Sequence, residues 1–172
     1  MTAPVDSYTR PQSVVLVVLQ VLIGWHFLFE GLAKVTSSHW TAAAYLAESQ
    51  WWFKGVFVRL AASPAALVVV DFLNSWGLVA IGVGLMLGLL TRYAAIAGIT
   101  ALALYYVAAP PFVGLSYAMP SEGSYLIVNK VLIEGVALLV LVMFPTRRLY
   151  GLDRLWFALR HRSTDASVHA PA

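Results

Sequence analysis

The chain has 172 residues, of which 60% are hydrophobic and 11% are charged, and its formal net charge is +3. The charged fraction is less than half of the roughly 25% found in soluble domains. The absence of cysteine excludes disulfides, thiolate catalysis and cysteine-ligated metals. No basic run interleaved with aromatic residues indicates a nucleic-acid partner. We therefore expect one small integral membrane domain whose main partner is lipid.

The N-terminal third contains the first predicted membrane span. Residues 1–13 are polar and predict a cytoplasmic arm. Residues 14–33 are apolar and, at about 20 residues, long enough to cross ~30 Å of hydrocarbon as a helix. Residues 34–65 combine several aromatic side chains with charges, a composition typical of helices at the membrane interface. We expect one or two such helices in this first outer loop.

Three further spans are predicted. Residues 66–90 and 93–109 are apolar and separated by Thr91-Arg92, so these helices should be antiparallel neighbours. Gly84 and Gly88 predict a small-residue face that packs on the third span. Proline at 110 and 111 ends that span, because proline has no amide hydrogen and restricts the preceding residue. Residues 125–144 form the fourth span. The expected fold is all-α, an integral membrane four-helix bundle within residues 14–160.

The C-terminal part predicts a surface helix and fixes the orientation. Apolar residues recur at three- and four-residue steps between 147 and 160, among arginines, which predicts a short cytoplasmic amphipathic helix. Residues 161–172 are expected to be a disordered tail. Seven arginines fall on the side of the termini and the 91–92 turn, against Lys54 and Arg59 on the other side. The positive-inside rule therefore predicts cytoplasmic termini in a multi-pass inner (plasma) membrane protein.

Ionisable side chains occur inside the predicted spans, where each costs about 2.5–3.5 kcal/mol and usually marks a function or a buried pair. The first span carries His26, Glu30 and Lys34 at four-residue spacing, on one helix face. In the predicted orientation the other polar span residues come to the same depth, in the outer half of the bilayer; these are Asp71, Asn74, Tyr105, Asn129, Lys130 and Glu134. The sequence thus predicts one connected polar site.

Charge pairing within this site has two interpretations. Glu30 with Lys130 and Glu134 with Lys34 are plausible pairs between helices. Such pairs can build a ligand or catalytic site, but they can also simply fix helix register, and both interpretations stay open. No bound metal or haem is expected, since the predicted spans contain His26 as their single histidine.

Several motifs resemble the DoxX/DoxD family. They are Gly24-Trp25-His26-Phe27-Leu28-Phe29-Glu30-Gly31-Leu32-Ala33-Lys34, Asn74-Ser75-Trp76-Gly77, Gly88-Leu89-Leu90-Thr91-Arg92, Tyr105-Tyr106 followed by Pro110-Pro111-Phe112, and Asn129-Lys130 followed by Ile133-Glu134. The resemblance covers about residues 14–160 and is closest to the DoxD-type branch, named for the small membrane subunit of thiosulfate:quinone oxidoreductase. It implies electron transfer from a sulfur compound into the quinone pool, with a DoxA-like or other redox protein as partner.

With this resemblance, each polar residue has an expected role. Glu30, His26 and Glu134 are the candidate catalytic groups, because quinone reduction requires protons. Residues expected to bind quinone, as co-substrate, or the sulfur compound are Lys34, Lys130, Asn129, Asn74, Asp71, Trp25 and Tyr105. Two other functions are left open: a non-catalytic membrane anchor or assembly subunit for redox proteins, and a proton-coupled small-solute carrier. The carrier would require a homo-oligomer, since no internal repeat is detectable.

Overall fold

The computed structural model describes residues 8–112, 114, 115, 117, 126–144, 146, 151 and 152. Every regular element among them is an α-helix, so the described part of the chain is all-α. The helices are α1 (Arg10–Thr36), α2 (Ala43–Ala47), α3 (Lys54–Ala62), α4 (Pro64–Leu87), α5 (Thr91–Ala108) and α6 (Lys130–Met143). Apart from residues 151 and 152, the predicted helix at 147–160 and tail at 161–172 lie outside the described residues.

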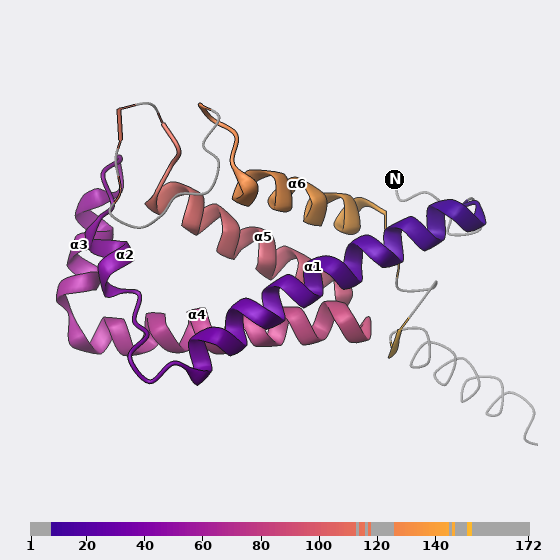
Figure 1. Ribbon diagram of the computed structural model, residues 1–172, viewed down its shortest axis with the longest axis horizontal. Helices are drawn as coiled ribbons and strands as arrows, with labels where there is room; N and C mark the ends of the chain where they lie inside the picture. The colour runs from indigo at the N-terminus through magenta and orange to yellow at the C-terminus, as the bar shows by residue number, and fades with distance from the viewer. Residues whose placement is uncertain are drawn as a thin grey trace, which may run out of the picture.

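Helices α1, α4, α5 and α6 run lengthwise, whereas α2 and α3 lie at one end (Figure 1). α4 and α5 are antiparallel neighbours, as expected from the short turn between them (Figure 1). α1 crosses α4 obliquely and packs mainly against it, while α6 packs mainly against α5. In the view of Figure 1, the ribbons of α1 and α6 separate toward the end that carries α2 and α3.

Capping side chains determine where three of the helices begin. Thr9 and Gln12 each accept a hydrogen bond from the other's amide, a capping box that begins α1 at Arg10 rather than at the predicted residue 14. The Ser63 hydroxyl caps α4. The Asn129 side chain accepts a hydrogen bond from the Leu132 amide, so α6 begins at residue 130 instead of the predicted 125. The predicted fourth span, 125–144, therefore includes residues that precede the Asn129 cap.

Glycine packing differs in part from the expectation. Gly84 faces the third span as expected, since an added Cβ would lie 3.2 Å from the Ala94 Cβ. Gly88 instead ends α4, with a φ of 61° in the left-handed region that favours glycine. The tightest helix approach is between α4 and α1, where a Cβ added to Gly82 would lie closest to the Leu28 amide nitrogen and 2.7 Å from the Gly24 carbonyl oxygen.

Two apolar clusters hold the helices together. The larger lies among the lengthwise helices and consists of Ile23, Phe27, Leu78, Ile81, Leu85, Ala95, Leu102, Leu138 and Leu141. The smaller joins α2 and α3 to α4 and α5 around Ala42, Leu46, Phe57 and Ala108. The end of the molecule that carries α2 and α3 is therefore itself packed.

Helices α1 and α4 are long and apolar enough to cross a membrane. Only 28% of the most apolar window of α1, and 22% of that of α4, is buried inside the molecule. The core helix of a soluble protein would bury most of such a window. The exposed apolar surface of these two helices therefore supports association with a membrane.

Candidate ligand-binding cavity

Side chains from all four lengthwise helices line a cavity of about 120 Å³, which has room for several water molecules or a small ligand group. Its polar lining consists of His26, Glu30, Lys34, Tyr105, Lys130 and Glu134, and its apolar lining of Phe27, Leu78, Leu102 and Val131. The helical repeat explains the contribution of α1, because residues four apart lie on one face. Six of the ten residues predicted to form the site are thus brought together.

A short contact joins α1 to α6 across this cavity. The Nδ1 atom of His26 lies 2.6 Å from the Oε1 atom of Glu134, within hydrogen-bonding distance. The glutamate side chain is largely enclosed, at 14% exposed, whereas that of His26 is 45% exposed. An imidazole held against a carboxylate is a pair through which a proton can pass to a bound molecule.

Lys34 contacts side chains other than Glu134, its predicted partner on another helix. Its Nζ lies 3.7 Å from Oε2 of Glu30, one turn earlier on α1. The same ammonium lies over the rings of Trp40, at 5.3 Å from the centroid, and Tyr105, at 5.6 Å, in the geometry of a cation–π contact. With Glu134 bonded to His26, these contacts replace the predicted pair of Glu134 with Lys34.

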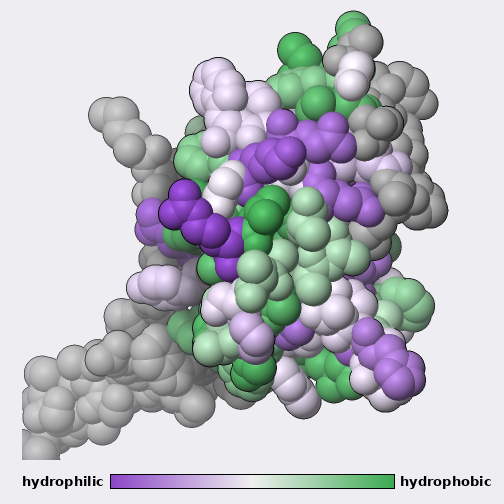
Figure 2. All heavy atoms as spheres, turned by 90° about the vertical axis from the view of Figure 1, so that its left-hand side faces the viewer, coloured by the Kyte–Doolittle hydropathy of each residue, from purple (hydrophilic) through white to green (hydrophobic). Residues whose placement is uncertain are grey.

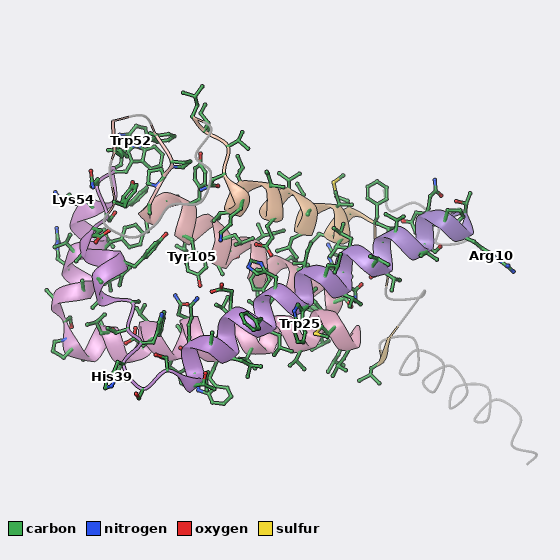
Figure 3. All side chains as sticks on the ribbon, viewed as in Figure 1. Arg10, Trp25, His39, Trp52, Lys54 and Tyr105 are labelled. Carbon is green, nitrogen blue, oxygen red and sulfur yellow. The ribbon has the colours of Figure 1, made fainter. Side chains whose placement is uncertain are left out.

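Tyr105 connects the cavity to the packed end of the molecule. Its hydroxyl donates a hydrogen bond to Oδ1 of Asn74, at 2.9 Å, and its carbonyl accepts one from the Tyr45 hydroxyl, at 2.8 Å. Burial raises the pKa of Tyr45 to about 12, so this hydroxyl remains a donor at neutral pH. Figure 3 shows Tyr105 on the half of the molecule nearer Trp52 and Lys54, with Arg10 at the opposite end.

Four of the predicted site residues lie outside the cavity lining. Asp71 accepts a hydrogen bond from the Ala42 amide, at 2.8 Å, and so fixes the start of α2. Asn129 caps α6, and Asn74 accepts a hydrogen bond from the Tyr105 hydroxyl. Trp25 is exposed on the surface of α1 beside Phe29. Among the described residues, no group of three or more histidines and acids is arranged to hold a metal ion.

A second buried polar group, which the sequence analysis missed, lies near the other end of the bundle. Gln20 is fully buried, and its Nε2 donates a hydrogen bond to the Leu85 carbonyl at 2.7 Å. The hydroxyl of Thr146 donates to Oε1 of Gln20. The available signal was a third polar side chain, besides His26 and Glu30, within the apolar run 14–33. This contact ties α1 to the end of α4 and to the segment after α6.

The cavity lining therefore contains two carboxyl groups, two ammonium groups, one imidazole and one phenol. Such a lining can bind a polar head group and exchange protons with it. Comparisons with protein-family models, with curated proteins and with solved structures found no match for the chain.

Proposed function

We propose that the protein is the membrane subunit of an oxidoreductase that passes electrons from a thiosulfate-like sulfur compound to quinone, with the cavity as the quinone-protonating site. The observation that carries this proposal is the convergence of His26, Glu30, Lys34, Lys130 and Glu134 on one cavity. Groups that are costly inside a membrane are commonly retained for function.

In this function, α1, α4, α5 and α6 form a bundle inside the bilayer, with both termini in the cytoplasm. The 14 residues of α6 extend about 21 Å as a helix, less than the ~30 Å of hydrocarbon. Irregular backbone within a membrane requires internal hydrogen bonds, and Tyr106 supplies one by donating to the Ile127 carbonyl, at 2.7 Å, ahead of α6. Residues 126–129 with α6 thus serve as the fourth crossing.

Quinone reduction requires protons at the cavity and electrons from a separate donor. A quinone takes up two electrons and two protons to become a quinol. Two thiosulfate ions give up two electrons when they join through a new S–S bond. In this mechanism the His26–Glu134 pair passes protons to a quinone carbonyl bound in the cavity, and Lys130 offers a positive charge for the reduced oxygen. A redox partner protein, such as a DoxA-like subunit, delivers the electrons.

Anchoring of such a partner is the second candidate function. Trp52 is almost fully exposed and stacks on Trp51, with ring centroids 4.9 Å apart. Lys54 and Arg59 are exposed on the adjacent α3. Figure 2 shows hydrophilic and hydrophobic side chains interspersed on this end of the molecule. Aromatic side chains and arginine are enriched where proteins dock.

Quinone reduction by the purified protein with its co-purified partners tests the first function. Glu134→Gln keeps the shape of the side chain but replaces its carboxyl group with an amide, so turnover should fall roughly a hundredfold, in the range typical of a lost general acid or base. Glu48→Gln, outside the cavity, is the matched control and should retain turnover. Full activity of a folded Glu134→Gln protein would remove the cavity from the mechanism and favour the anchoring function.

A further inference from the structure

The cavity is covered on the side of α2 and α3. The smaller apolar cluster fills the space between these helices and α4 and α5. Two hydrogen bonds fasten this cover to the bundle: the Tyr45 hydroxyl donates to the Tyr105 carbonyl, and the Ala42 amide donates to Asp71. Trp40, which packs against the same cluster, lies over the ammonium of Lys34. A water-soluble ion arriving at this end meets packed apolar side chains.

The cavity is open along the side between α1 and α6. The side chains of His26 and Glu30 are 45% and 48% exposed, whereas those of Glu134 and Lys34 are 14% and 16% exposed. The exposed pair lies one turn apart on α1, and His26 marks the edge of α1 that contacts α6. Phe29 on α1 and Ile133 on α6, which adjoin His26 and Glu134 along their helices, are exposed and apolar, and the cavity residue Lys130 on α6 is exposed as well. An apolar border of this kind suits contact with acyl chains.

We infer that the cavity opens sideways into the bilayer between α1 and α6, and that its ligand is a lipid-soluble molecule with a polar head group. The identification of that head group as a quinone rests on the proposed function. A sulfur dianion would lose its hydration on crossing the apolar border, so its oxidation is assigned to the redox partner, outside the cavity. The His26–Glu134 contact crosses the opening and is the bond that an arriving head group displaces.

A spin label tests the opening without reference to any ligand. The chain contains no cysteine, so Ala33→Cys gives a single attachment site. Ala33 lies seven residues after His26, within about 20° of it around α1, and is exposed. In protein reconstituted into lipid nanodiscs, collisions with oxygen, which partitions into lipid, should exceed those with a water-soluble nickel chelate. Dominant nickel collisions would show a water-filled opening and overturn the inference.

Binding kinetics of a decyl-tailed quinone test the route itself. Ala33→Trp narrows the opening, so association and dissociation should both slow about tenfold, while Kd changes less than about threefold. Ala80→Trp is the matched control, because Ala80 is exposed on α4, about 200° around the helix from the cavity residue Leu78. If Ala33→Trp leaves the quinone association rate unchanged and Tyr45→Phe increases it, the ligand enters through the α2–α3 cover, and the inference is overturned. If the wild-type protein binds no quinone, the proposed function fails, and the spin label still decides the opening.

Discussion

The contact between α1 and α4 offers a sharp test of the packing that positions the cavity. A Cβ at Gly82 would lie 2.7 Å from both the Gly24 carbonyl oxygen and the Leu28 Cα. Both are backbone atoms, so neither can turn aside. Restoring an ordinary contact near 3.5 Å requires the helices to separate by roughly 1 Å. Since α1 carries three of the polar cavity residues, this separation also disturbs the cavity.

Gly82→Ala should therefore destabilise the protein. Overpacking costs about 1–3 kcal/mol, and contact with backbone on both sides favours the upper value. The higher helix propensity of alanine offsets about 1 kcal/mol of this cost, which leaves the free energy of unfolding lower by about 2 kcal/mol. The free energy of unfolding can be measured in mixed micelles by titration with a denaturing detergent.

Gly77→Ala is the matched control on the same helix. A Cβ added there meets no atom within 4 Å, so this variant should gain about 0.5–1 kcal/mol from propensity. The two substitutions are chemically identical and differ in the space available. Equal stability of the two variants would refute the close approach of α1 and α4.

Three further predictions concern the cover and its hydrogen bonds. Tyr105→Phe leaves the Asn74 acceptor without its donor and should lower the free energy of unfolding by about 1–2 kcal/mol, whereas Tyr93→Phe, at an exposed tyrosine, should not change it. Asp71→Ala should increase amide hydrogen exchange in α2 by about tenfold, in keeping with the loss of a cap, and Asp71→Asn should restore part of the protection. Burial raises the pKa of Tyr45 to about 12, above the unfolded value near 10. The unfolded chain therefore loses this proton first, stability should fall as pH rises from about 10 to 12, and Tyr45→Phe should reduce that fall in a thermal-unfolding series.

Local periodicity accounts for what the sequence predicts well. The spacing of His26, Glu30 and Lys34 follows the helical repeat, and all three line the cavity. The same helical geometry could have excluded Trp25 from the predicted site, because Trp25 lies about 100° around the helix from His26. Its side chain is exposed on the surface.

Two polar residues assigned to the site have capping roles instead. Asn129 stands directly before α6 and accepts a hydrogen bond from its first turn, and asparagine is among the preferred N-cap residues. This role was therefore readable in the sequence. Asp71 is different, because it caps a helix 29 positions away in the chain. A contact of that range depends on how α2 packs against α4, which periodicity does not specify.

The partners of the charged side chains likewise could not be predicted from periodicity. Sequence spacing allows Glu30 to contact Lys34 one turn away, but it cannot rank that contact against partners on other helices. The observed arrangement depends on where α6 places Glu134 relative to His26. Such choices are set by the relative position of packed helices rather than by local pattern.

Covalent labelling by a photoreactive, isoprenoid-tailed quinone in lipid nanodiscs tests the central claim most directly. If the cavity binds the quinone head group, mass spectrometry should find the label on peptides around His26–Lys34 and Lys130–Glu134, and excess unlabelled quinone should prevent the labelling. Labelling confined to the α2–α3 end, or labelling that excess quinone does not reduce, would contradict quinone binding in the cavity.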